Sequence, residues 1–276
     1  MLTAVNERRE AKKNSVARDP AVALLRTIDL TKSYITRSGD SLFALKATSL
    51  ALEDGEFVSV VGPSGCGKST LMMLIAGIIP RSEGEIIYRG HAVTRAQRGM
   101  GVVFQSPVLL PWSTVMENVL LPIRILGGDR AAATARAEQL LSTVGLQGFE
   151  HKYPSELSGG MQQRVSIARS LIHDPGLLLM DEPFGALDAL TRERMSLELQ
   201  NIWLANRKTV FFITHSILEA VFLSDRVLVM SARPGCIIRE FRIPFVRPRD
   251  FDLSTTKEFG AYVGEIRHLL GAKVDA

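Results

Sequence analysis

Five short hydrophobic runs recur along the chain, and amphipathic segments alternate with them. The runs are EFVSVVG (56–62), MGVVFQ (100–105), LLLMDE (177–182), TVFFIT (209–214) and DRVLVMS (225–231). Continuous hydrophobicity, as opposed to strict alternation, is typical of strands that are buried on both faces of a parallel sheet. We expect helices to follow Lys68, Gly160, Leu187 and His215. Repeated strand–helix units predict an α/β domain built on a parallel sheet.

Three other segments have a different character. The stretches at 23–34, 42–55 and 84–90 look like strands of a small antiparallel sheet, and turn-forming residues bound them. We therefore predict an antiparallel β subdomain beside the parallel sheet.

Between about 106 and 157 the strand pattern is absent, and apolar residues recur at helical spacing instead. Ser113 or Thr114, followed by Glu117, resembles a capping box that would begin one of these helices. This stretch is predicted to be a helical subdomain that interrupts the sheet domain.

The ends of the chain are expected to lie outside this domain. Residues 1–20 carry charges but no apolar stretch suited to a secretory signal, so we expect a disordered tail. Residues 21–245 would form the main domain, and residues 246–276 a C-terminal extension with one amphipathic helix. No apolar run approaches the roughly 18 residues that a membrane-spanning helix requires.

Composition narrows the class of protein only slightly. Hydrophobic residues make up 46% of the 276 positions, enough for a large core, and the two cysteines fit a reducing cytosol. The net charge of +4 permits contact with nucleic acid or anionic lipid but argues for neither. A late group of basic residues is expected to be solvated surface, with a membrane-proximal or regulatory face as the alternative. Its members are Arg233, Arg239, Arg242, Arg247 and Arg249.

The segment GPSGCGKST matches the phosphate-binding motif G-x-x-x-x-G-K-[ST] without a mismatch, after a buried strand and before a helix. The glycines allow backbone N–H groups to curl around phosphate oxygens. Lys68 would contact the β- and γ-phosphates of ATP, and the Ser69 hydroxyl would ligate Mg²⁺. The predicted nucleotide-binding loop consists of Gly62, Pro63, Ser64, Gly65, Cys66, Gly67, Lys68, Ser69 and Thr70. Cys66 is assigned no catalytic role.

The run LLLMDE delivers two acidic residues to the carboxyl end of a buried strand, which is where ligands bind in open α/β sheets. Asp181 would hold Mg²⁺ through its water shell. Glu182 would orient or deprotonate the attacking water. Together with the loop, this strand end predicts a site that hydrolyses ATP.

A second phosphate-binding pattern, LSGGMQQR, places Ser158, Gly159 and Gly160 at the start of a helix. With the first loop and LLLMDEPFGALD, it resembles the motifs of ATP-binding cassette (ABC) transporter proteins. The resemblance covers about residues 21–245. It implies a P-loop NTPase (RecA-like) core with the antiparallel subdomain and helical insert described above.

The resemblance also implies an explanation for the two phosphate-binding patterns. In such proteins two cassettes pack head to tail, and each ATP lies between the loop of one subunit and the LSGG segment of the other. Ser158, Gly159 and Gly160 would then contact the ATP of the partner subunit. One copy of each motif implies a homodimer, or a heterodimer with a similar cassette.

Further site residues follow from the resemblance, each with a simpler alternative. Tyr34 would stack on adenine, or be a half-buried strand tyrosine. Gln105 would approach Mg²⁺ and water, or be a polar strand end, and His215 would contact the γ-phosphate, or cap a helix. Asp188 would act at the dimer interface, cap the following helix, or do both. Ser216 stands where importer cassettes commonly have an acidic residue, which puts the local hydrogen bonding in doubt.

Hydrolysis in this family is coupled to transport. Leu109, Leu110, Pro111 and Trp112 would form an apolar lip that receives an integral membrane permease, unless they pack inside the insert. The cassette would lie at the cytoplasmic face of the inner (plasma) membrane, and a solute-binding protein would serve the same system. Three segments are similar to nitrate, sulfonate and taurine importers: LLPWSTVMENVLLPIRILG, LSDRVLVMSARPGCI and RPRDFDLSTTKEF. The solute itself is not encoded.

Other classes of cassette protein fit less well. A chromosome-maintenance ATPase would carry a long coiled-coil insertion, and a translation-associated one would carry two cassettes, so no nucleic-acid partner is expected. Intact Lys68, Glu182 and His215 argue against a regulatory module that does not hydrolyse ATP. A separate-chain exporter, or an importer of another solute class, remains the alternative.

Overall fold

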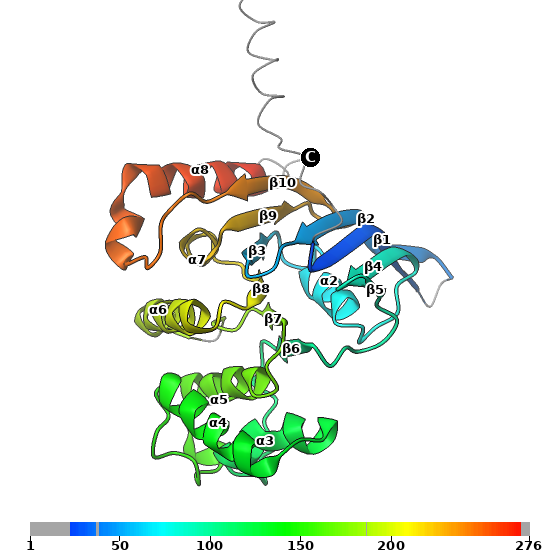
Figure 1. Ribbon diagram of the computed structural model, residues 1–276. Helices are drawn as coiled ribbons and strands as arrows, with labels where there is room; N and C mark the ends of the chain where they lie inside the picture. The colour runs from blue at the N-terminus through cyan, green and yellow to red at the C-terminus, as the bar shows by residue number, and fades with distance from the viewer. Residues whose placement is uncertain (1–22, 37–38, 186, 272–276) are drawn as a thin grey trace, which may run out of the picture.

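The computed structural model describes residues 23–36, 39–185 and 187–271, and the statements below concern those residues. A larger and a smaller sheet lie beside each other, with helices along one face of the larger sheet and a separate helical group at one end (Figure 1). The tail expected at residues 1–20 falls outside the described residues.

The larger sheet has the strand order β10-β9-β3-β8-β7-β6. Its strands are β3 (Phe57–Val61), β6 (Met100–Val103), β7 (Leu177–Asp181), β8 (Thr209–Ile213), β9 (Arg226–Met230) and β10 (Ile237–Arg242). Neighbours are parallel, except that β10 pairs antiparallel with β9. The five hydrophobic runs therefore form the five parallel strands, as predicted. The sequence pattern does not predict β10, because half of its residues are charged and it contains neither a continuous apolar run nor a regular alternation.

The parallel strands separate two hydrophobic cores. β3, β8 and β9 are buried along their whole length. Phe57 and Val61 of β3 face the core beneath the helices, whereas Val58 and Val60 face the core beneath the smaller sheet. Successive side chains of a strand point to opposite faces, so one short apolar run contributes to both cores.

The smaller sheet is antiparallel throughout and has the order β2-β1-β4-β5. Its strands are β1 (Leu25–Ile35), β2 (Ser41–Leu52), β4 (Glu83–Tyr88) and β5 (His91–Ala92). Helix α2 (Lys68–Ile75) fills the space between the two sheets, since Leu71 and Ile75 share a core with Leu25 and Leu45. The predicted antiparallel subdomain is present.

The helical group lies at the β6 end of the larger sheet (Figure 1). It contains α3 (Val115–Leu126), α4 (Arg130–Thr143), η1 (Pro154–Glu156) and α5 (Gly159–Leu171). The predicted capping box begins α3: Thr114 accepts a hydrogen bond from the Glu117 N–H at 3.2 Å, and Glu117 accepts one from the Thr114 N–H at 2.9 Å. Helix α5 packs against α3 and α4, so the helical layer continues to Leu171.

The remaining helices cover the face of the larger sheet that is opposite the smaller sheet. They are α6 (Ala189–Asn206), α7 (Ile217–Leu223), η2 (Phe251–Thr255) and α8 (Lys257–Gly271). Phe259 and Ile266 of α8 are buried in the larger core, so the described part of the segment after residue 245 packs firmly onto the domain. Across residues 23–36, 39–185 and 187–271, no helix has the length and apolar character needed to cross a bilayer.

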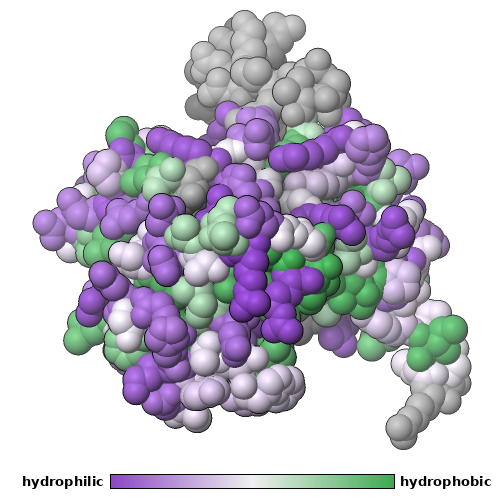
Figure 2. All heavy atoms as spheres, turned by 60° about the horizontal axis from the view of Figure 1, so that its bottom comes forward, coloured by the Kyte–Doolittle hydropathy of each residue, from purple (hydrophilic) through white to green (hydrophobic). Residues whose placement is uncertain are grey.

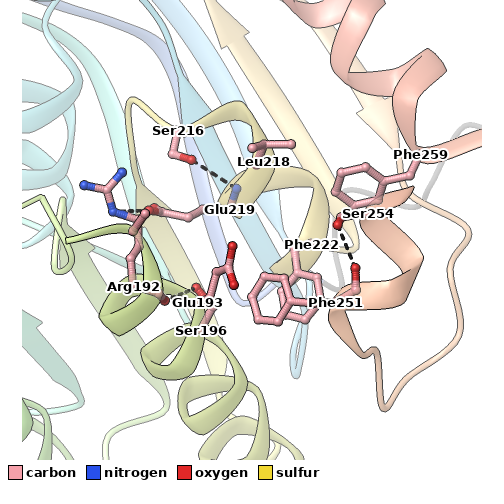
Figure 3. A pocket seen from close by; sticks show the side chains of 11 residues that line it. Arg192, Glu193, Ser196, Ser216, Leu218, Glu219, Phe222, Phe251, Ser254 and Phe259 are labelled. Atoms are coloured by element: carbon pink, nitrogen blue, oxygen red, sulfur yellow. Dashed lines mark hydrogen bonds and ion pairs between the residues drawn. The ribbon is translucent and has the colours of Figure 1, made fainter. Parts of the chain in front are cut away.

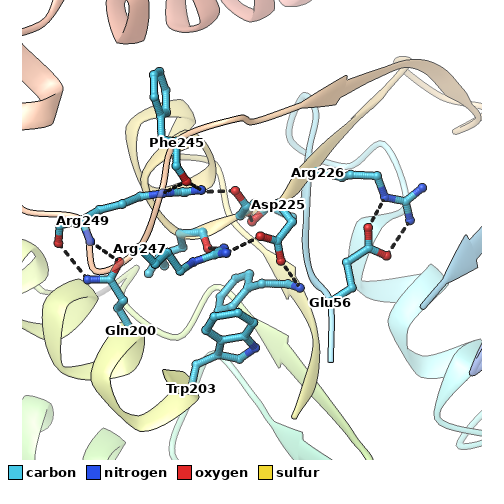
Figure 4. Close-up of polar contacts among 12 residues, drawn as sticks. Glu56, Gln200, Trp203, Asp225, Arg226, Phe245, Arg247 and Arg249 are labelled. Atoms are coloured by element: carbon cyan, nitrogen blue, oxygen red, sulfur yellow. Dashed lines mark hydrogen bonds and ion pairs between the residues drawn. The ribbon is translucent and has the colours of Figure 1, made fainter. Parts of the chain in front are cut away.

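The expectation of a solvated surface is wrong for two arginines of the late basic group (Figure 4): Arg249 is buried, and the side chain of Arg247 is 9% exposed. Arg249 is 3% exposed. Its guanidinium donates to three carbonyl oxygens at the C-terminal end of α7, those of Val221, Phe222 and Ser224, at 2.7 to 3.1 Å. The last carbonyls of a helix have no partners within the helix, so a buried guanidinium can satisfy them.

Arg247 completes this arrangement, which we call the C-terminal brace (Arg247 and Arg249). Its guanidinium forms an ion pair with Asp225, donates to the Leu223 carbonyl and lies over the Trp203 ring, 4.3 Å from the centroid. Burial, with the Arg247 charge as a smaller cause, lowers the pKa of Arg249 to about 9, which leaves it protonated at neutral pH. The brace therefore ties the C-terminal segment to the end of α7.

Candidate functional site

The predicted nucleotide-binding loop connects β3 to α2 and borders a cavity of about 300 Å³. The lining residues include Ser64, Gly65, Gly67, Lys68, Ser69, Thr70 and Glu182. Lys68 is largely buried, and its ammonium donates to the carbonyls of Gly62 and Pro63 at 2.9 and 3.0 Å. Cys66 is buried and does not line the cavity, in agreement with the absence of a catalytic role for this residue.

Gly67 shows why the loop requires glycine at the helix start. It is the N-cap of α2 and has a φ of 105°, a backbone conformation that side chains disfavour. An added Cβ would lie 2.8 Å from the Ala44 carbonyl oxygen of β2. Glycine therefore lets the loop close against β2 and aim the amides of α2 at the cavity.

Three polar side chains lie together at the ends of three adjacent strands, and two of them contact the same carboxylate oxygen of the third. Glu182 follows β7, and its Oε2 lies 3.4 Å from the Gln105 Nε2 after β6 and 3.2 Å from the His215 Nδ1 after β8. Glu182 has a φ of 44°, and its N–H donates to the Ile213 carbonyl at 2.8 Å. A non-glycine residue in this left-handed region is uncommon and strained. The sheet thus brings together the three predicted catalytic residues.

Asp181 lies at the end of β7 beside the loop. Burial raises its pKa, a hydrogen bond from the Ser69 hydroxyl opposes this, and the neighbouring Glu182 charge adds to the rise. An ionised carboxylate in this position calls for a compensating cation. The oxygen donors of Ser69, Gln105 and Asp181 are of the type that Mg²⁺ prefers. The residues present therefore fit a magnesium–nucleotide complex at the loop.

The LSGG segment lies away from this cavity, on α5 in the helical group (Figure 1). Ser158 is the N-cap of α5 and accepts a hydrogen bond from the Met161 N–H at 3.3 Å. Ser158 and Gly159 are exposed, and among the described residues that line the loop cavity Ser158, Gly159 and Gly160 do not occur. The structure does not bring the two phosphate-binding patterns together within one chain.

Two other predicted residues are also placed. Tyr34 lies near the end of β1, 44% exposed, with the Lys32 ammonium 4.9 Å from its ring centroid. Asp188 caps α6, because its carboxylate accepts the Thr191 N–H at 3.0 Å, and this backbone hydrogen bond lowers its pKa. The capping interpretation of Asp188 is confirmed, and its role at a dimer interface stays a prediction.

Ser216 replaces the expected acidic residue without loss of the local hydrogen bonding. It is the N-cap of α7 and accepts the Glu219 N–H at 3.3 Å. Serine and aspartate are comparable N-caps, which explains the tolerance. The Glu219 carboxylate accepts a 2.6 Å hydrogen bond from Thr214, the residue before His215.

Glu219 also borders a second cavity, of about 150 Å³, between α6, α7 and η2 (Figure 3). Its carboxylate forms a 3.3 Å ion pair with Arg192 of α6, and burial raises its pKa despite these partners. On the other side, Phe222 and Phe251 stack with ring centroids 4.5 Å apart. The segment around His215 is thus connected to α6 and to the C-terminal segment.

Sequence reasoning missed several residues that shape the site. Arg233 lines the loop cavity and donates to the Gly65 carbonyl at 3.1 Å. Fully buried Asn118 bonds both backbone groups of Leu110, at 2.8 and 3.1 Å. Arg169 donates to the carbonyls of the segment after Gln105. Arg233 and Arg169 contact positions far away in the chain, and Asn118 bonds backbone that does not lie in its own helix, so no local motif signals these contacts.

Comparison with known proteins agrees with this geometry. Residues 45–185 match the family described as ABC transporter. The taurine import ATP-binding protein TauB of Rhizobium johnstonii is 51% identical over 214 residues, covering 78% of this chain and 82% of the relative. The aliphatic sulfonates import ATP-binding protein SsuB of Bacillus cereus is 44% identical over 225 residues, covering 81% and 88%. The dimeric structure of MJ0796, a bacterial ABC transporter cassette, matches with a TM-score of 0.72 and 33% identity, covering 80% of this chain and 100% of that one.

The chain therefore belongs to the ABC transporter family, as one of its ATP-binding cassettes. It is an ATPase with the P-loop NTPase fold, which confirms the resemblance, the fold class and the activity that the motifs predict.

Proposed function

We propose that this chain is the ATP-hydrolysing subunit that powers uptake of a small sulfonate, such as taurine, through a separate membrane permease. The observation that carries the proposal is the identity of 51% and 44% with a taurine import and an aliphatic sulfonates import ATP-binding protein, over most of both chains. Nitrate remains an alternative solute, because a cassette has no contact with the transported molecule.

At the loop cavity, Lys68 and the backbone amides of the loop would hold the β- and γ-phosphates of ATP. Ser69 and Gln105 would ligate Mg²⁺ directly, and Asp181 would do so through water. When bound there, Mg²⁺ neutralises phosphate charge. Glu182 would orient or deprotonate the attacking water, while His215, 3.2 Å from its carboxylate, would contact the γ-phosphate.

The exposed LSGG segment supports a second role for α5, toward another subunit. Ser158, Gly159 and Gly160 would close over ATP held by the loop of a partner, and Tyr34 would stack on the adenine of its own subunit's ATP. The related MJ0796 cassette is dimeric. A homodimer requires only this chain, and a heterodimer with a similar cassette is the alternative.

The segment after Gln105 is suited to contact the permease. Val108 and Trp112 are 60% and 73% exposed, whereas Leu109 packs against the larger core. Asn118 and Arg169 hold the backbone of this segment, so its apolar side chains project from a rigid support. Figure 2, with the helical end turned forward, shows hydrophobic residues gathered between hydrophilic ones on this side of the molecule.

In such a system the cassette would lie at the cytoplasmic face of the plasma membrane. A solute-binding protein would deliver the sulfonate to the permease, and no nucleic acid takes part. ATP binding would close the cassette dimer and hydrolysis would reopen it, which is a two-state switch driven by differential binding.

Reconstitution with the permease and the solute-binding protein in lipid vesicles tests the proposal. Taurine or an alkyl sulfonate should stimulate ATP hydrolysis, and Glu182→Gln should abolish the stimulated and the basal rates. Trp112→Ala should weaken the solute-stimulated rate, whereas Val246→Ala, at an equally exposed apolar residue of the C-terminal segment, should not. Stimulation by nitrate or another solute, but by no sulfonate, would overturn the assignment of the substrate.

A further inference from the structure

The turn between β9 and β10 brings a second cation to the loop cavity. Arg233 lines this cavity together with Lys68 and Glu182, and its Nη2 donates to the Gly65 carbonyl at 3.1 Å. The phosphate-binding loop, the strand end LLLMDE and the LSGG segment do not include this residue. Its position at the cavity depends on the folding of the turn onto the loop.

The turn is held firmly in this place. The Gly235 N–H donates to the Ala44 carbonyl of β2 at 3.0 Å, and the Cys236 N–H donates to the Ser231 hydroxyl at 3.0 Å. An added Cβ at Gly235 would lie 2.1 Å from the Cys66 carbonyl oxygen. Only glycine permits the turn to approach the loop so closely, and this approach presents Arg233 to the cavity.

Within residues 23–36, 39–185 and 187–271, no carboxylate pairs with the charge of Arg233. Among the described residues, the Gly65 carbonyl is its only hydrogen-bond acceptor, and the side chain is exposed. By contrast, Arg226 of the neighbouring strand forms ion pairs with Glu56 and Glu240. A guanidinium has five N–H donors, so one bond to Gly65 leaves most of them available to a ligand. Planar paired donors of this kind match the oxygens of a phosphate group.

We propose that Arg233 binds phosphate oxygens of the nucleotide in the loop cavity, while its bond to Gly65 holds the guanidinium in place. This inference rests on the proposal that the cavity is the nucleotide site. Arg233 then adds to the affinity for ADP and ATP, and adds nothing to the affinity for adenosine, which has no phosphate.

Nucleotide binding to the Arg233→Ala variant tests the inference. Calorimetry with ADP, and with ATP in a Glu182→Gln background, should show dissociation constants about tenfold higher than with Arg233, since hydrogen bonds to charged groups contribute about this much. The difference should shrink at high salt, and Arg233→Lys should recover part of it. Arg242→Ala removes the same charge from the same hairpin, at an exposed residue of β10, and should leave both constants unchanged.

Several results would overturn the inference. These are unchanged ADP affinity in Arg233→Ala, an equal loss for adenosine, or a loss confined to ATP-driven dimerisation, which would place Arg233 against the partner subunit. A lower melting temperature with unchanged ADP affinity would show that Arg233 only supports the turn. Lys68→Ala distinguishes the two proposals: if this variant also binds ADP normally, the cavity is not the nucleotide site.

Discussion

Two arginines in the C-terminal third of the chain, Arg249 and Arg233, differ in burial and in the number of protein carbonyls that accept their hydrogen bonds. Arg249 is buried, and carbonyls at the end of α7 and at Phe245 accept its donors. Arg233 is exposed at the loop cavity, and a single carbonyl accepts from it. A buried cation must be satisfied by the protein, whereas a cation that serves a ligand keeps donors free. We call the group of Asp181, Glu182 and Arg233 beside the loop cavity the nucleotide edge. Available hydrogen-bond donors, more than charge, distinguish Arg233 of this group from the arginines of the C-terminal brace.

The comparison predicts that changes at the nucleotide edge affect chemistry more than folding. Glu182→Gln should slow ATP hydrolysis at least about a hundredfold, because it would remove the proposed general base. The midpoint of urea unfolding should stay close to that of the unmodified protein. Hydrolysis within tenfold of normal would rule out Glu182 as the base.

Changes in the C-terminal brace should affect folding stability more than ATP hydrolysis. Arg249→Met should lower the free energy of unfolding by about 3 kcal/mol, because several buried carbonyls lose their donor at once. Urea unfolding measures this, and Arg242→Met, at an exposed arginine of β10, is the control that should change it by less than about 0.5 kcal/mol. A loss below about 1 kcal/mol for Arg249→Met would mean that water can replace the guanidinium at the end of α7.

Asp181→Asn, in the nucleotide edge, should make the nucleotide-free protein more stable and impair its response to Mg-ATP. Burial raises the pKa of Asp181, so its ionised form costs free energy in the nucleotide-free protein at neutral pH. Asparagine should therefore raise the melting temperature and abolish further stabilisation by Mg-ATP. The gain should diminish as the pH falls through the raised pKa, since Asp181 itself is then protonated. A lower melting temperature at neutral pH would contradict this account.

The smallest effect is expected at an exposed group of ion pairs around Asp174, outside both regions. Asp174 accepts from Arg136 and Lys208 at 2.9 and 3.0 Å, and Lys208, then Arg136, lower its pKa. Asp174→Asn should destabilise by less than about 1 kcal/mol at neutral pH, because exposed pairs are screened by water. A lowered pKa stabilises above the unfolded value, so the difference should vanish as the pH falls through the folded pKa. An effect as large as that of Arg249→Met would show that exposure is a poor guide here.

The sequence predicts the elements of this protein better than its long-range contacts. The five hydrophobic runs become five parallel strands, and Thr114 with Glu117 begins a helix, because these signals are local. The meeting of Gln105, Glu182 and His215 follows from strand ends placed side by side, which the parallel pattern implies.

Prediction from the sequence fails where the environment of a side chain depends on backbone groups far away in the chain. Arg233, Arg247 and Arg249 belong to one basic stretch, yet the first is exposed and the other two are braced against α7. Nothing in their immediate neighbours distinguishes them, since the accepting carbonyls lie on segments far away in the chain. Strand β10 is missed for a related reason: its charged sequence has no strand pattern of its own, and its pairing with β9 lies between segments that the sequence does not show to be neighbours.

The carboxylate of Glu182 contacts two segments that lead to different parts of the molecule. Gln105 leads into the helical group and His215 leads into α7, and both reach the same oxygen of Glu182. If either segment shifts, this oxygen loses one of its two polar neighbours. The activation of water by Glu182 would then depend on the positions of both the helical group and α7. A change at the surface of either one could alter ATP hydrolysis without contact with the nucleotide.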